Sequence, residues 1–162
     1  MIREEEIGAL LVARSLTLVT AESCTGGLVA HRITDVPGSS AYFLGGFVAY
    51  ANEAKEALLG VRHETLLAHG AVSEQTALEM ARGARQRLGA DLGISTTGIA
   101  GPAGGTPDKP VGLVYVALSA SGVGLCWRYV WQGDRLANKE QSAEAALQLL
   151  LSHLQGEAFG DG

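Results

Sequence analysis

The stretch that decides the fold is residues 16–34, LTLVTAESCTGGLVAHRIT. It begins with the β-forming run LTLVT, which predicts a short strand over residues 16–20. Residues 28–34 predict a helix, which the following Pro-Gly pair ends. The polar turn between them therefore joins a strand to a helix, at the end of the sheet where α/β proteins bind ligands.

Helical and extended patterns alternate along the rest of the chain. Apolar spacings of three and four, together with capping residues, predict helices at 3–14, at 52–58 with Asn52 as N-cap and Gly60 as the end, at 74–88 with Ser73 as N-cap, and from Arg135 to 154. Strands are predicted at 43–50, where Gly45-Gly46 indicates a bulge or a close backbone approach, at 92–97, and as a hairpin of 111–120 and 125–131.

This order predicts an α/β fold. We expect a three-layer α/β/α arrangement with a mixed, mainly parallel sheet that contains an antiparallel hairpin. One domain is expected over residues 1–155, followed by a frayed tail at 156–162.

The composition limits the classes of function. The formal net charge is −5 and no run of Lys or Arg occurs, so we expect no nucleic-acid partner. The chain shows no signal segment and no membrane-length apolar stretch, which predicts no membrane partner and a cytoplasmic location. Cys24 and Cys126 lack metal or redox spacing, and His63-Glu64 does not continue as a zinc motif, so we expect no metal and no cofactor. A small anionic ligand remains compatible, because one Arg and a few N–H groups can hold a phosphate.

The turn after the first strand offers a nucleophile. Ser23 precedes a helix start, whose free N–H groups can bind a phosphate or the oxyanion that forms when an amide is attacked. Gly26 and Gly27 would let a ligand approach the backbone closely. The alternative is that Ser23 or Thr25 only caps the helix. Cys24 is a rival nucleophile, or a small buried apolar residue.

A serine nucleophile needs a base. The chain has no G-x-S-x-G elbow, Gly26 excludes the S-x-x-K pattern, and no His lies in a recognisable pairing. Lys55 follows the second predicted strand. If the two strand ends are adjacent, Tyr50 and Lys55 face Ser23, and a desolvated Lys with a lowered pKa can act as the base. The alternative is a solvated lysine on a helix surface.

A second glycine-rich turn, TGIAGPAGG at residues 97–105, follows the strand 92–97. Its glycines suit an anion nest or a close ligand contact, although it is neither a Walker A loop nor a dinucleotide fingerprint. An ordinary surface turn is the alternative. Arg135 can pair with a phosphate bidentately, or it is a surface residue.

Together these segments resemble the CinA C-terminal-domain family, whose stand-alone members include nicotinamide mononucleotide deamidases. The matching motifs, spread over about residues 5–150, are TAESCTGG (20–27), ITDVPGSS (33–40), GFVAYANEAK (46–55), GAVSEQTALEMA (70–81), GIAGPAGG (98–105), KPVGLVYVAL (109–118) and GDR (133–135). The resemblance implies hydrolysis of the carboxamide of nicotinamide mononucleotide to nicotinic acid mononucleotide and ammonia, a recycling step in pyridine nucleotide metabolism. It places the catalytic serine, lysine and tyrosine at Ser23, Lys55 and Tyr50. It places substrate contacts at Glu22, Thr25, Gly26, Gly27, Thr97, Gly98, Gly101, Gly104 and Arg135.

From these residues we hypothesise a mechanism. Neutral Lys55 takes the Ser23 proton, directly or through Tyr50, and backbone N–H groups near Thr25 and Gly26 hold the oxyanion. Attack by a Lys55-activated water is the alternative to an acyl-enzyme. The expected partners are a small-molecule nucleotide substrate and, by resemblance, a second copy in a homodimer.

Longer family members carry an N-terminal domain that resembles molybdopterin-binding proteins, and its activities are not expected of this chain. The alternative function is a non-catalytic nucleotide-binding module, or a partner module associated with competence and DNA damage.

Overall fold

The fold is an α/β domain, seen here in a computed structural model that describes residues 2–156; residues 157–162 of the predicted tail lie outside the described residues. The elements follow in the order α1 (Arg3–Arg14), β1 (Leu18–Glu22), α2 (Leu28–Thr34), the 3-10 helix η1 (Ser39–Ala41), β2 (Phe43–Val48), α3 (Asn52–Leu59), α4 (His63–His69), α5 (Glu74–Leu88), β3 (Leu92–Gly98), β4 (Leu113–Ala120), β5 (Val123–Val130) and α6 (Arg135–Leu154). The strands form one sheet in the order β2-β1-β3-β4-β5.

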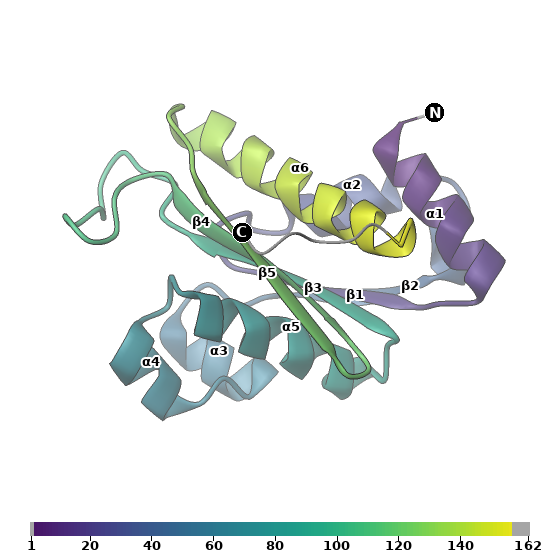
Figure 1. Cartoon of the computed structure of the whole chain (residues 1–162), viewed down its shortest axis with the longest axis horizontal. Coiled ribbons are helices and arrows are strands. Elements are labelled where there is room, and N and C mark those ends of the chain that lie inside the picture. The colour runs from purple at the N-terminus through teal and green to yellow at the C-terminus, as the bar shows by residue number, and fades with distance from the viewer. Residues whose placement is uncertain (1, 157–162) are drawn as a thin grey trace.

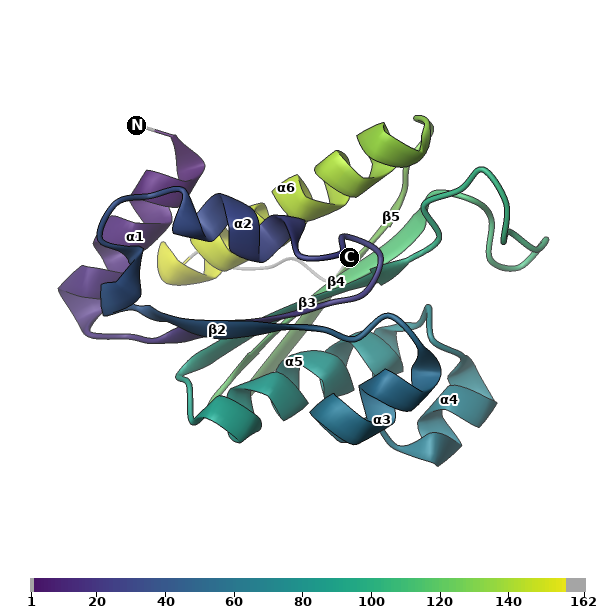
Figure 2. The same cartoon turned by 180° about the vertical axis from the view of Figure 1, so that it is seen from behind.

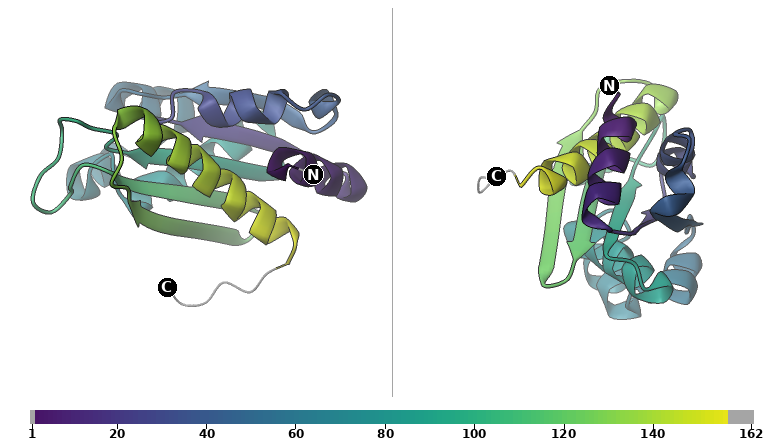
Figure 3. Two further views of the ribbon diagram at one scale, coloured as in Figure 1. Left: turned by 90° about the horizontal axis from the view of Figure 1, so that it is seen from above. Right: turned by 90° about the vertical axis from the view of Figure 1, so that its right-hand side faces the viewer.

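Helices cover both faces of this sheet. α1, α2 and α6 lie over one face and α3, α4 and α5 over the other (Figure 1), and the view from behind shows β2 at the edge opposite β5 (Figure 2). Seen from above, α6 runs along the sheet with α1 and α2 beside it (Figure 3). The predicted three-layer fold is confirmed.

The sheet is mixed, as predicted, and ends in the predicted hairpin. β1 pairs in parallel with β2 and β3, whereas β4 pairs antiparallel with both β3 and β5. Only β4 is reversed, so most strands share one direction although the pairings divide evenly between parallel and antiparallel.

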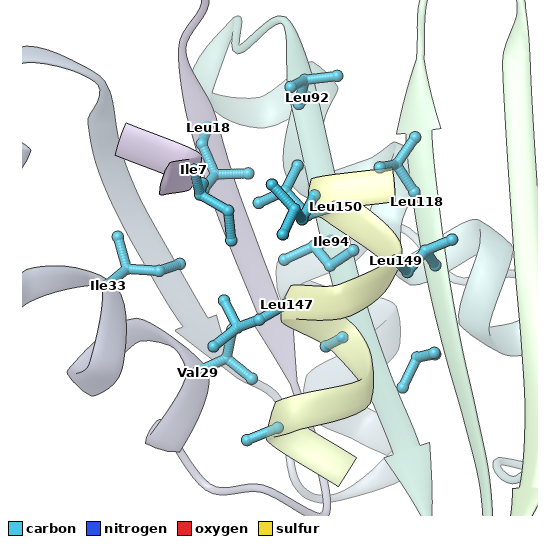
Figure 4. Packing of buried hydrophobic residues seen from close by; sticks show 14 of the residues in the cluster. Ile7, Leu18, Val29, Ile33, Leu92, Ile94, Leu118, Leu147, Leu149 and Leu150 are labelled. Atoms are coloured by element: carbon cyan, nitrogen blue, oxygen red, sulfur yellow. The ribbon is translucent and has the colours of Figure 1, made fainter. Parts of the chain in front are cut away.

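The larger core lies between α6 and the sheet. Leu147 and Leu150 of α6 are buried in one cluster with Ile94 of β3 and Leu118 of β4 (Figure 4). The apolar residues that recur every three or four positions in the last predicted helix are buried here, because such residues share one helix face. Each fully buried leucine contributes about 1.5–3 kcal/mol of apolar transfer free energy.

The backbone of β2 at Gly46 closely approaches the Thr20 side chain of β1, which confirms the approach predicted at Gly45-Gly46. A Cβ atom on Gly46 would lie 2.4 Å from Thr20 Oγ1, so only glycine fits there. The register between the two strands also shifts between Leu18 and Val19. This tight pairing fixes the relative positions of the segments that follow the two strands.

Several element boundaries differ from the sequence prediction. β1 continues to Glu22, because sheet pairing on both sides buries the strand over its whole length. Asn52 is the first helical residue of α3 and Ala51 holds the N-cap position, so the predicted Asn52 cap is wrong. The predicted caps at Ser73 and Gly60 are confirmed. Helix α4 is missing from the prediction because seven residues carry too little periodicity.

Within residues 2–156, no helix combines the length and apolar character that crossing a bilayer requires.

Candidate active site

Two neighbouring strands bring Ser23 and Lys55 together. β1 and β2 are parallel and adjacent, with Glu22 opposite Val48, so the residues that follow them emerge at the same edge of the sheet. Ser23 follows β1 directly, and its N–H donates to the Thr96 carbonyl of β3 at 3.0 Å. The Ala49 N–H donates to the Glu22 carbonyl at 2.8 Å. Both turns are therefore anchored to the sheet where they begin.

Helix α3 then returns the lysine to the serine. Lys55 lies in the first turn of α3, where side chains lean toward the helix N-terminus. Its Nζ lies 3.0 Å from Ser23 Oγ, although the two residues are 32 positions apart in the chain. The same amine donates to the carbonyls of Ala49 at 3.0 Å and Tyr50 at 2.9 Å. The condition set by the sequence, that the two strand ends be adjacent, is met.

The surroundings of Lys55 favour its neutral form. The side chain is only 1% exposed, and this burial lowers the pKa of the amine. A cation in the first turn of α3 also meets the positive end of the helix dipole. A neutral amine has two N–H donors and one lone pair. With the N–H groups on the two carbonyls, the lone pair is left for the Ser23 hydroxyl.

Ser23 and Lys55, called the dyad below, line a small pocket of about 220 Å³. The pocket walls come from the turns after β1 and β2, the first turn of α3, the segment before α5, the end of β3 with the turn after it, and the start of α6. The lining residues are Ser23, Cys24, Tyr50, Lys55, Ala71, Val72, Thr97, Gly98, Ala100 and Arg135. Such a volume is below the roughly 300–1,000 Å³ of pockets that enclose a drug-sized ligand. A larger ligand would place only one end inside.

Cys24 does not compete with Ser23 as the nucleophile. Burial raises the pKa of the Cys24 thiol to about 12, so the thiolate is scarce at neutral pH. Cys24 is also part of the apolar cluster beneath α6. Its second predicted role, as a small buried apolar residue, fits both observations.

The Glu22 carboxylate occupies the N-terminus of α2, where the sequence analysis predicted that free N–H groups bind a ligand. One carboxylate oxygen accepts from the Thr25 hydroxyl at 2.6 Å and from the N–H groups of Gly27 at 3.2 Å and Val29 at 2.8 Å. The other accepts from the Ala30 N–H at 3.0 Å. A buried carboxylate of the chain itself thus fills the positive end of α2. The structure places Glu22 as the internal cap of α2 instead of at the pocket wall.

The remaining residues of that turn are likewise used internally. The Thr25 hydroxyl lies 2.7 Å from the Thr96 hydroxyl, and the Gly26 N–H donates to the Ser23 carbonyl at 3.1 Å. Thr25, Gly26 and Gly27 shape the turn behind the nucleophile and are not among the pocket-lining residues. Of the two predicted oxyanion donors, the Gly26 N–H already has an acceptor.

The second glycine-rich turn forms the opposite wall of the pocket. Thr97 and Gly98 line it, and the Thr97 hydroxyl donates to the Ala71 carbonyl at 2.8 Å. Gly101 contributes its carbonyl oxygen, which accepts from Arg135 at 2.8 Å. Of the predicted contacts in this turn, Gly101 and Gly104 both lie outside the pocket lining.

Arg135 and the Tyr50 phenol form the rim of the pocket. Arg135 Nη2 donates to the Tyr50 hydroxyl at 3.2 Å, while Nη1 holds Gly101. The Tyr50 side chain is 62% exposed. Only its backbone carbonyl contacts Lys55, so the contact between Lys55 and Ser23 is direct and does not pass through the phenol.

Sequence reasoning missed Ala71, Val72 and Asn138. The first two are small apolar residues whose chemistry gives no signal of a site. Asn138 is buried in α6, and its amide donates to the Ala100 carbonyl at 3.0 Å and accepts from the Gly133 N–H at 3.0 Å. Its position three residues after the GDR motif is the one clue that the sequence offered.

Comparison with known proteins agrees with this architecture. Residues 2–154 match the CinA C-terminal domain. The chain belongs to the CinA C-terminal domain family. A CinA-like protein from Chloroherpeton thalassium is 57% identical over 151 residues, which is 91% of this chain and 36% of that protein. The chain thus spans little more than a third of the length of the curated relatives it matches.

Solved structures of CinA relatives share the whole fold. The competence damage-inducible protein A from Klebsiella pneumoniae matches with a TM-score of 0.91 and 37% identity, covering 94% of this chain and 95% of that one. The competence/damage inducible protein CihA from Agrobacterium tumefaciens matches with a TM-score of 0.87 and 42% identity, covering 96% and 97%. The family and its α/β fold are established by these matches, and the reaction is argued from the site.

Proposed function

We propose that this CinA domain hydrolyses the carboxamide of nicotinamide mononucleotide, giving nicotinic acid mononucleotide and ammonia. The observation that carries the proposal is the buried contact between Lys55 Nζ and Ser23 Oγ at 3.0 Å. A serine hydroxyl becomes a nucleophile when an adjacent base removes its proton, and a desolvated lysine can be that base near neutral pH. The choice of substrate comes from the family resemblance of the motifs around the dyad.

In the first half of the reaction, the neutral Lys55 amine accepts the Ser23 proton while Ser23 Oγ attacks the carboxamide carbon. The carbonyl oxygen becomes an oxyanion, which N–H groups that face the pocket would stabilise. The Lys55 ammonium then gives its proton to the departing nitrogen, and the C–N bond breaks to release ammonia. An ester between Ser23 and the nicotinoyl group remains.

In the second half, water replaces ammonia. Lys55, neutral again, takes a proton from the water as it attacks the ester carbonyl, and returns that proton to Ser23 Oγ as the ester breaks. The two carbonyls of Ala49 and Tyr50 hold the amine in one orientation through both halves. No further proton carrier is needed, because one amine alternates between base and acid.

Ammonia release from nicotinamide mononucleotide tests the proposal. Ser23→Ala is expected to lower turnover by orders of magnitude, while Cys126→Ala, on the far hairpin strand β5, should not change it. A trapped acyl adduct on Ser23, seen by mass spectrometry, would distinguish the ester from direct attack by water. Tight binding of the nucleotide without ammonia release would instead favour the non-catalytic module, a role compatible with the competence names of the relatives.

A further inference from the structure

Lys139 lies beside the nucleophile turn, and the mechanism above gives it no task. A Cβ atom placed on Gly26 would be 3.8 Å from Lys139 Nζ, so the ammonium lies against the backbone three residues after Ser23. Its charge also reaches Cys24, where it lowers the pKa of the thiol against the larger effect of burial. The distance to Gly26 places this cation next to the turn that carries Ser23, and its effect on Cys24 follows from the same position.

The position of Lys139 is fixed by the helix start on which it lies. Lys139 follows Arg135 by four residues on α6, so the two side chains project from the same helix face. Asn138, between them, is buried and bonded to Ala100 and Gly133, which anchors this turn of α6 to the second glycine loop. Both cations are therefore presented from a rigid support.

No carboxylate within residues 2–156 forms a salt bridge with Lys139 or Arg135. Arg135 uses two of its five N–H donors on Gly101 and Tyr50, and the others remain for an anion. Two cations without an acidic partner, one helical turn apart, attract a group with a double negative charge more strongly than a neutral one.

The size of the pocket explains why an anion would be recognised outside it. Its volume of about 220 Å³ surrounds the dyad and accommodates one end of a nucleotide. Once the carboxamide is at Ser23, the ribose phosphate must extend beyond the rim. Arg135 forms part of that rim, and Lys139 lies one turn further along α6.

We propose that Lys139, together with Arg135, binds the phosphate of the substrate and so makes the site selective for a mononucleotide over the phosphate-free riboside. This inference rests on the proposed function, since it concerns the outer end of the same substrate. Lys139 acts on binding and not on the dyad, so its loss should raise KM and leave kcat largely unchanged.

The test compares nicotinamide mononucleotide with nicotinamide riboside in ammonia-release assays of the wild type and Lys139→Gln. The expected result is an increase in KM of about tenfold for the mononucleotide, the lower range for a hydrogen bond to a charged group, and no change for the riboside. Lys139→Arg should restore most of the affinity. Lys109→Gln is the matched control, because it removes the same charge from a loop side chain whose ammonium donates to the His69 carbonyl and does not line the pocket.

Calorimetry in a Ser23→Ala background makes the test independent of turnover. The mononucleotide should bind about tenfold more weakly when Lys139→Gln is added, and the riboside equally with or without it. Equal losses on both ligands, an unchanged mononucleotide affinity, or no binding of the mononucleotide to Ser23→Ala would each overturn the inference. A wild type that binds the mononucleotide through Lys139 but releases no ammonia would refute the proposed reaction alone.

Discussion

Replacing Lys55 with Met removes the proposed base and leaves the shape of the site nearly intact. Met has a similar length and volume, and Lys55 is almost fully buried, so the new side chain can occupy the same space. What is lost is the amine that contacts Ser23 Oγ and the carbonyls of Ala49 and Tyr50.

The two losses differ in size and can be measured separately. General base catalysis typically contributes about 10²–10⁴-fold, so kcat should fall by that factor. For stability, leaving two carbonyls without their donor costs about 1–3 kcal/mol each, while removing a buried, desolvated amine is a gain of similar size. We expect the free energy of unfolding to change by no more than about 2 kcal/mol.

The assay is ammonia release from nicotinamide mononucleotide at saturating substrate, with urea unfolding of the same preparations. Lys109→Met serves as the control and should match the wild type in both measurements. A folded Lys55→Met variant with a kcat within threefold of the wild type would refute the assignment of Lys55 as the base. A variant that fails to fold directs the test to Lys55→Arg, which keeps the charge but cannot supply a neutral lone pair at neutral pH.

Three further predictions follow from the site and the core. Only neutral Lys55 accepts a proton, so kcat/KM should rise as pH increases through the pKa of Lys55, which burial places below 10.5. The unfolded chain holds that proton more tightly, so the free energy of unfolding should also rise with pH between that pKa and 10.5. A kcat/KM that stays constant from pH 6 to 10 would contradict the assignment of Lys55 as the base. Cys24→Ala should keep kcat within a few-fold of the wild type, and iodoacetamide at pH 7 should not abolish ammonia release, because burial raises the thiol pKa to about 12; a rapid loss of ammonia release that substrate prevents would show a reactive Cys24. Glu22→Ala should lower the free energy of unfolding by roughly 2–4 kcal/mol, since it leaves the N–H groups of Gly27, Val29 and Ala30 without their acceptor; an unchanged urea midpoint would mean that the cap contributes nothing.

Much of the fold was predictable because its signals are local. The strand-to-helix unit around Ser23, the capped helix after Ser73, the terminal helix and the hairpin all follow from periodicity and turn chemistry within short windows. Helix α4 was not predictable in this way, because its seven residues are held by contacts with α5 and carry little pattern of their own.

For the candidate site, the sequence predicted the residues better than their surroundings. Sequence reasoning named Ser23 and Lys55, but on residue types alone Lys55 was equally compatible with a solvated helix surface. Sequence reasoning also predicted that the start of α2 binds a ligand. Nothing in a linear sequence shows that the Glu22 carboxylate folds back and accepts from four donors at that helix end.

By itself the sequence determined most of the elements, the family and the two glycine-rich turns, since these depend on neighbours along the chain. Only the tertiary structure decided that an amine 32 positions away meets the serine hydroxyl in a buried contact. The physical reason is the parallel pairing of β1 with β2, which brings the ends of two strands to one edge of the sheet and lets the first turn of α3 bury its lysine there.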